Sequence, residues 1–261
     1  MIDAKGSIHR KNGQRPAAKW FFAVVATTML IIVLIAFSRT FFFRPLSSVM
    51  DLSATLGQQT LPWYLVVHGT VLTAWYALFC AQTWLAVFRK IGWHRRLGAI
   101  GIGISAAVTV SAISTTILFV PRALESGRPI ENVTKVVVGN LLLQASFVLC
   151  VSLAVYWRRW PDLHKRLMYY AAIASIKPAF AAGDRVFGAF LERLLPAVIA
   201  SNRFFIAVAV CVGALALFDW VTDRRTRPVT VVPGLLLLTD EIVAMNSDST
   251  SWGQHLVNWL S

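Results

Sequence analysis

Apolar residues form long, nearly uninterrupted runs along this chain, without the alternation of apolar and polar positions typical of a half-buried strand. A bilayer core about 30 Å thick needs about 20 apolar residues per helix, and most of the runs have about that length. Lipid offers no partners for backbone N–H and C=O groups, so helices are expected rather than open sheets. Six membrane-spanning helices are predicted, over Trp20–Ser38, Leu61–Phe88, Gly98–Val120, Val136–Trp157, Leu167–Phe187 and Leu194–Trp220.

The last part of the chain carries a weaker apolar run. Val231–Leu238 is too short to span a bilayer, and Asp240 and Glu241 follow it at once. A seventh span is predicted over Pro228–Met245, which would carry both acids into the membrane interface or the bundle. The segment Trp252–Leu260 is predicted to be an amphipathic helix at the membrane surface. Its apolar side would consist of Trp252, Leu256, Trp259 and Leu260.

Composition agrees with an all-α, polytopic transmembrane bundle. Hydrophobic residues make up 57% of the chain and charged residues 14%, against about 45–50% and about 25% in soluble domains. The first run lacks a small-residue cleavage site after it and is predicted to remain as a span. All three cysteines fall inside apolar runs, which favours packed thiols over disulfides. Three regions are expected: a basic tail at 1–19, the bundle at 20–227, and the last membrane helix with the interfacial helix at 228–261.

The net charge of +13 is distributed unevenly between the two sides of the predicted bundle. The N-terminal tail and the turns expected on its side hold sixteen basic residues and four acids, and the opposite side holds eight and five. By the positive-inside rule, this asymmetry predicts a cytoplasmic N-terminus. The basic surplus therefore indicates topology and contact with anionic lipid headgroups, not nucleic-acid binding.

Two of the basic segments carry nearly the same sequence, HRRLG at 94–98 and HKRLM at 164–168. A shift of 70 residues superposes His94 on His164 and Arg96 on Arg166, which predicts a parallel duplicated helical hairpin. Both motifs are expected in cytoplasmic loops, with the two histidines at one membrane depth. They are interpreted either as helix-start residues whose neighbours bind headgroups, or as a pseudo-symmetric site for an anion, a metal or haem. The arginines suit an anion better than a cationic metal.

Polar side chains also occur inside the predicted spans. His68, Trp75 and Gln82 are seven residues apart and form one stripe on a helix. Asn140 and Gln144 are one turn apart on another helix. Such residues normally face the bundle interior, where they hydrogen-bond neighbouring helices or bind a ligand.

Lys177 is the most unusual of these residues, because it lies near the middle of its span and precedes a proline. An ammonium there costs about 2.5–3.5 kcal/mol on the insertion scale. It is expected to pair with Asp184, one heptad further along, or with His68 or Gln82 across the bundle. Asp184 and the adjacent Arg185 are candidate functional residues for the same reason.

Four sequences, HGTVLTAWYALFCAQTWL (68–85), HRRLG, PDLHKRLMYYAAIA (161–174) and FDWVTDRRTRP (218–228), resemble a family of uncharacterised bacterial multi-pass membrane proteins. That family combines a His…Trp…Gln helix with HRxLG and HKRLM motifs in this order. The resemblance covers roughly residues 20–230 and implies a seven-helix inner-membrane protein. It implies no particular activity. The chain is also loosely similar to the helical cores of membrane b-type cytochromes.

No nucleophile elbow, phosphate-binding loop, HExxH or CxxC motif occurs, and the prediction is a non-enzymatic protein without a required cofactor. The leading hypothesis is small-ligand binding or transport along a polar intramembrane lining. The alternative is a membrane electron-transfer protein that binds haem through His94 and His164 or meets quinone. A structural or assembly role without a ligand is the third possibility. The predicted lining consists of His68, Trp75, Gln82, Asn140, Gln144, Lys177, Asp184 and Arg185.

Overall fold

The computed structural model describes residues 16–43, 62–194 and 203–261, and these parts of the chain are helical without any strand. The elements are α1 (Pro16–Ala36), the π-helical turn η1 (Ser38–Phe42), α4 (Trp63–Val87), α5 (Ile91–Glu125), α6 (Ile130–Tyr156), α7 (Pro161–Leu194), α9 (Arg203–Asp223), α10 (Pro228–Asn246), the 3₁₀ turn η2 (Ser247–Ser249) and α11 (Ser251–Leu260).

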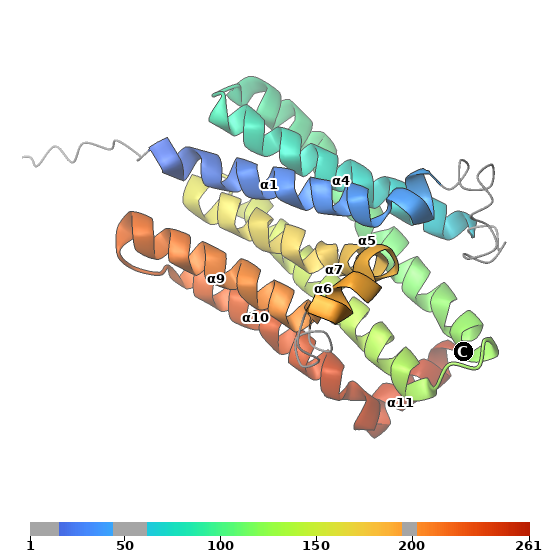
Figure 1. Cartoon of the computed structure of the whole chain (residues 1–261). Coiled ribbons are helices and arrows are strands. Elements are labelled where there is room, and N and C mark those ends of the chain that lie inside the picture. The colour runs from blue at the N-terminus through green and yellow to red at the C-terminus, as the bar shows by residue number, and fades with distance from the viewer. Residues whose placement is uncertain (1–15, 44–61, 195–202) are drawn as a thin grey trace, which may run out of the picture.

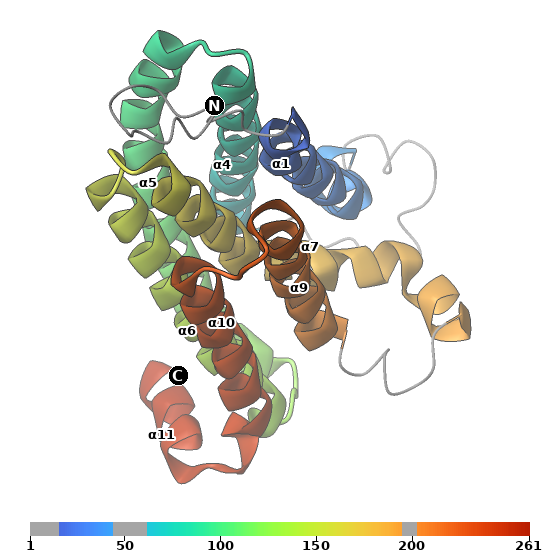
Figure 2. The same cartoon turned by 90° about the vertical axis from the view of Figure 1, so that its left-hand side faces the viewer.

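The long helices run side by side as a bundle (Figure 1). The turns α4–α5, α6–α7 and α9–α10 lie at one end, and the α5–α6 turn and α11 lie at the other (Figure 1). The turns α4–α5, α6–α7 and α9–α10 carry the arginine-rich segments, so most basic residues of the described turns gather at one end, here called the basic end. The helix α6 contacts α5, α7, α10 and α11, and the last of these lies at the edge of the bundle (Figure 2).

Within the described residues, five helices are long and apolar enough to cross a membrane: α4, α5, α6, α9 and α10. This is consistent with a multi-pass membrane protein. The helix expected over Pro228–Met245 is present as α10, and the surface helix expected near the C-terminus is present as α11. The apolar part of α1, Trp20–Ala36, is shorter than the five, and α7 lies outside the set. A total of six or seven spans, and the common origin of the two hairpins, remain predictions.

The placement of HRRLG and HKRLM in loops was wrong. The helix α5 already begins at Ile91 and α7 at Pro161, so each histidine lies in the first turn of a helix. The connections are correspondingly short, and Arg89 takes a left-handed φ of 57° in the first of them. Both helices extend beyond their apolar runs, because the backbone hydrogen bonds continue through the polar residues. Pro161 also suits the first position of a helix.

The helix α7 lies at the centre of the packing. Every residue from Tyr169 to Ala174 is buried, on all sides of the helix. A helix that is buried all round is enclosed by other helices, and α7 contacts α1, α6, α9 and α10. The small side chains Ala171, Ala172 and Ala174 allow those helices to approach closely. Polar groups in the segment Tyr169–Ala174 therefore meet protein and not lipid.

A close approach between helices gives a direct test of this packing at Gly234 of α10. A Cβ there would lie 2.8 Å from Val212 Cγ1 and 3.0 Å from the Tyr170 hydroxyl oxygen. We expect Gly234→Ala to lower the free energy of unfolding by about 1–3 kcal/mol, the usual cost of overpacking. Thermal unfolding of the detergent-solubilised protein measures the change.

The matched control is Gly213→Ala on the neighbouring helix α9, where a Cβ would have nothing within 4 Å. Alanine is favoured over glycine in a helix by about 0.8–1 kcal/mol, so this variant should be neutral or slightly stabilised. Equal melting temperatures for the two variants would contradict the described contact between α9, α10 and α7.

Candidate functional sites

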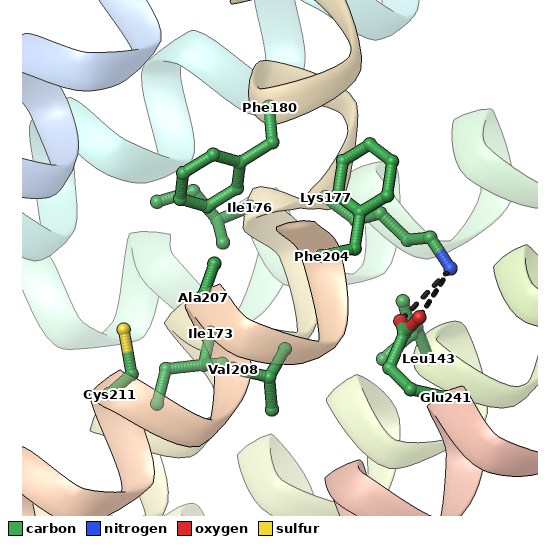
Figure 3. A pocket seen from close by; sticks show the side chains of 10 residues that line it. All are labelled: Leu143, Ile173, Ile176, Lys177, Phe180, Phe204, Ala207, Val208, Cys211 and Glu241. Carbon is green, nitrogen blue, oxygen red and sulfur yellow. Dashed lines mark hydrogen bonds and ion pairs between the residues drawn. The ribbon is translucent and has the colours of Figure 1, made fainter. Parts of the chain in front are cut away.

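The lysine in the middle of α7 forms a buried ion pair. Lys177 Nζ lies 2.9 Å from both carboxylate oxygens of Glu241, which projects from α10 (Figure 3). The Glu241 side chain is 4% exposed and that of Lys177 21%. The ring of Phe204 on α9 covers the ammonium, with its centroid 5.6 Å away. The expected partners His68 and Gln82 were wrong, because they bond elsewhere and α10 brings Glu241 to Lys177. The Asp184 and Arg185 side chains lie outside the described residues, so their predicted roles stay predictions.

A small cavity adjoins this ion pair, lined by Lys177, Glu241 and apolar side chains such as Ile173 and Phe180 (Figure 3). The centre of a water molecule can occupy only about 10 Å³ of it, which is about the room for one water molecule. In the described conformation, the cavity therefore has no room for a larger ligand.

A second carboxylate lies beside the pair. Asp240 is buried, and its Oδ2 accepts a hydrogen bond of 2.5 Å from Ser146 Oγ on α6. Gly139 of α6 leaves room for the lysine, since a Cβ there would lie 3.0 Å from Lys177 Nζ. Glu241 thus binds the ammonium while the adjacent Asp240 binds Ser146, and helices α6, α7 and α10 meet at this point.

The other polar residues of the predicted lining fall at separate helix contacts. His68 Nδ1 lies 3.0 Å from Ser111 Oγ on α5, and Gln144 Nε2 donates to Thr109 Oγ1 over 3.1 Å. Trp75 packs against an α6 phenylalanine, and its Nε1–H has no hydrogen-bond partner in the described part of the chain. The Asn140 amide has no partner there either. The structure does not bring these residues together with Lys177 around one cavity.

The two motif histidines meet at the basic end of the bundle. The ring centroids of His94 and His164 are 6.2 Å apart, with an angle of 81° between the ring planes. His94 Nδ1 lies 3.2 Å from the backbone oxygen of Gln82, and His164 Nδ1 lies 2.9 Å from that of Ala154. A carbonyl can only accept, so each Nδ1 carries the proton and donates it. Neither Nε2 has a hydrogen-bond partner among the residues described.

Gln82 belongs to this histidine pair and not to a lining shared with His68. Its Nε2 donates a 3.0 Å hydrogen bond to the backbone oxygen of His94. Its Oε1 is buried without a hydrogen-bond partner in the described regions. Two hydrogen bonds thus connect Gln82 of α4 with His94 of α5 across the turn, and they hold the His94 ring in one orientation.

His164 lies before the apolar part of α7, and burial lowers its pKa. The hydrogen bond to Ala154 raises the pKa in part, and the neighbouring His94 lowers it further. A second imidazolium beside the first would be repelled, and burial removes the water that would stabilise it. His164 therefore favours the neutral form, whose Nε2 can act as an acceptor or a metal ligand.

A network of charges holds three helices together beside the pair. Arg166 of α7 donates to Asp219 of α9, and both side chains are buried. Asp219 also accepts a 2.5 Å hydrogen bond from Thr230 Oγ1 of α10. The matching arginine of the other motif, Arg96, is instead exposed and lies over the Trp93 ring. The motif pair predicted from the sequence is therefore symmetric at its histidines but not at these arginines.

Asp162 completes the network at its exposed edge. Partial burial alone would raise the pKa of this carboxyl, but Lys165, Arg227 and Arg166 lower it to about 2. Partial burial alone would lower the pKa of the Arg227 guanidinium, but Asp223 and Asp162 raise it. These groups stay charged at neutral pH and fix the geometry of the first turn of α7.

No protein-family model, curated protein or solved structure matches the chain. The resemblance to the bacterial multi-pass family thus stays a prediction from its motifs.

Proposed function

We propose that this protein binds b-type haem between His94 and His164 and carries electrons at the basic end of its bundle. The observation that supports this is the meeting of the two imidazoles across the α4–α5 and α6–α7 turns. A metal lies about 2.0–2.1 Å from a histidine nitrogen. Each ring centroid lies about 1 Å behind that nitrogen, so two histidines on opposite sides of one metal have centroids about 6 Å apart. The observed separation is 6.2 Å.

The number of available ligands favours haem over a bare ion. Structural zinc sites use four protein ligands and catalytic ones three. The described residues contain no group of three or more His, Cys, Asp or Glu side chains that could hold a metal ion. Haem supplies four nitrogens of its own, and two axial imidazoles then complete its coordination.

The hydrogen bonds behind the rings support the same proposal. Metal-binding histidines usually donate their other N–H to a carbonyl or carboxylate, which fixes the tautomer and the ring orientation. His94 and His164 both donate in this way, to backbone oxygens at the ends of the preceding helices. Membership of the bacterial multi-pass family and a cytoplasmic basic end are parts of this proposal.

The second candidate is the binding or transport of a small ligand or ion through the bundle. It is favoured by the buried group Lys177, Glu241 and Asp240, since ionisable residues inside membrane helices usually mark ion or substrate pathways. This candidate needs a second conformation, because the described cavity has room for about one water molecule.

Titration of the purified, detergent-solubilised protein with haemin tests the leading proposal. We expect a saturable Soret band at one haem per chain, with the sharp α and β bands of low-spin, bis-histidine haem after reduction. His94→Ala and His164→Ala should each lose most of this binding, because one axial ligand is removed. His68→Ala is the control and should keep it, since His68 bonds Ser111 between α4 and α5, away from the pair.

Helical circular dichroism and a single size-exclusion peak establish that each variant is folded. Two results would overturn haem binding: no saturable band in the parent protein, or equal binding by the parent and both motif variants. Haemin that binds with a high-spin spectrum would likewise exclude two axial imidazoles.

A further inference from the structure

An open groove lies on the surface of α5 and α6 near the basic end, apart from the histidine rings. Its volume is about 630 Å³. Apolar side chains from both helices form its wall, among them Ile102, Val151 and Val155. At the end of α6 the wall changes character, where Arg158 and Arg159 follow directly.

The two arginines at this end have no counter-charge. Both are exposed, and neither guanidinium has an ion pair or hydrogen bond in the described parts of the chain. The next cations along the chain, Lys165 and Arg166 in the first turns of α7, both pair with aspartates. The hydroxyls of Ser152 and Tyr156 also border the groove without hydrogen-bond partners among the described residues, and Tyr156 is 78% exposed.

We propose that this groove binds one anionic phospholipid, with its phosphate on Arg158 and Arg159 and an acyl chain along Ile102, Val151 and Val155. We infer the ligand from the residues along the groove. Its wall is apolar and ends in two unpaired guanidinium groups, which matches an amphiphile with an anionic headgroup. Guanidinium groups bind phosphate oxygens by paired hydrogen bonds. Ser152 and Tyr156 supply further donors at the level of the headgroup. Tyr156 and the exposed Trp160 lie where aromatic residues mark a membrane–water interface.

The chain contains a matched control for the charge. Arg224 and Arg225 are also adjacent, exposed arginines in a turn at the basic end, but they do not border the groove. Arg158→Gln with Arg159→Gln and Arg224→Gln with Arg225→Gln remove the same charge from the same end. A difference between these two double variants therefore reports the groove and not the general attraction of a basic surface.

Native mass spectrometry of the delipidated protein, titrated with phosphatidylglycerol or phosphatidylcholine, measures the binding. We expect one phosphatidylglycerol per chain, bound at least tenfold tighter than phosphatidylcholine. The Arg158/Arg159 double variant should bind it about ten- to thirtyfold more weakly, the effect expected for two basic residues at a headgroup. The Arg224/Arg225 double variant should stay within about twofold of the parent. Ser152→Phe, which fills the groove without changing charge, should weaken both lipids.

Three outcomes would overturn the lipid site. Equal affinity of the parent and the Arg158/Arg159 variant would remove the role of the arginines. An equal loss in both double variants would reduce the effect to net charge. Loss of haemin binding in the Arg158/Arg159 variant, with lipid binding unchanged, would assign the groove to the cofactor. The lipid proposal and the haem proposal are tested independently. The haem variants His94→Ala and His164→Ala should leave the lipid affinity unchanged.

Discussion

Replacement of Glu241 by glutamine is expected to lower the free energy of unfolding by about 3–5 kcal/mol, the cost of leaving a buried charge without its partner. The change keeps the size and shape of the side chain but removes the charge that both 2.9 Å contacts give to Lys177 Nζ. The enclosed surroundings on α7 offer the ammonium little water as a substitute. Asp240 carries the nearest other described carboxyl, but its hydrogen bond with Ser146 directs it toward α6.

The double variant Lys177→Met with Glu241→Gln separates this charge effect from a general loss of packing. Removal of both charges should restore most of the stability lost by Glu241→Gln, because apolar replacements of buried ion pairs are often neutral or stabilising. Thermal melts in detergent of the parent, Glu241→Gln, Lys177→Met and the double variant give the four values needed. Additive losses would mean that the two side chains are not coupled, and the described ion pair would then be wrong.

The chain also supplies a surface pair of similar geometry as a control. Lys135 and Asp248 approach to 2.7 Å, but their side chains are 43% and 27% exposed. Exposed ion pairs contribute about 0–1 kcal/mol. Asp248→Asn should therefore leave the melting temperature close to that of the parent protein. The contrast with Glu241→Gln tests whether burial, rather than the short distance, determines the effect.

The second large effect is expected at Asp219. Asp219→Asn would leave the buried Arg166 guanidinium without its main counter-charge and would disturb the hydrogen bond from Thr230 Oγ1. We expect a loss of about 3–5 kcal/mol in the free energy of unfolding. Asp162 is the remaining anion near Arg166, at 3.5 Å, but its side chain is about half exposed and should compensate only partly.

Arg166→Met combined with Asp219→Asn should be more stable than Asp219→Asn alone, since no unpaired charge is then buried. Arg96→Met provides the control from the other motif. That arginine is exposed over Trp93, so its replacement should stay within about 0.5 kcal/mol of the parent protein. Similar melting temperatures for Asp219→Asn and Arg96→Met would contradict the burial of the Arg166–Asp219 pair.

The apolar runs of the sequence predicted most of the described helices, because a run of about 20 apolar residues favours a helix long enough to cross a membrane. Its helix ends were predicted poorly at His94 and His164, since a helix does not stop where its lipid contact stops. The central position of α7 was also missed. Its alanines and tyrosines are enclosed by other helices, and hydropathy alone cannot distinguish contact with protein from contact with lipid.

A candidate site could be predicted only where a short motif in the sequence marked its residues. The repeated histidine motif indicated that His94 and His164 lie at one depth, and the structure adds that their rings meet. The partner of Lys177 was not predictable in this way. A heptad spacing pointed to Asp184 on the same helix, whereas Glu241 lies 64 residues away, after a weak apolar run. Contacts between distant helices depend on which helices pack side by side. The spacing of residues within one helix does not indicate this.

Both buried ion pairs join α7 to helices that the ribosome makes later. Arg166 and Asp219 are 53 residues apart, and Lys177 and Glu241 are 64 apart. At about 5–20 residues per second, the lysine precedes its glutamate by roughly 3–13 s. Until then Lys177 lacks the carboxylate that neutralises it in the finished protein, and Arg166 has only the half-exposed Asp162 near it. Neither ion pair to α9 or α10 can form before those helices are made, so the final packing of α7 follows the synthesis of both.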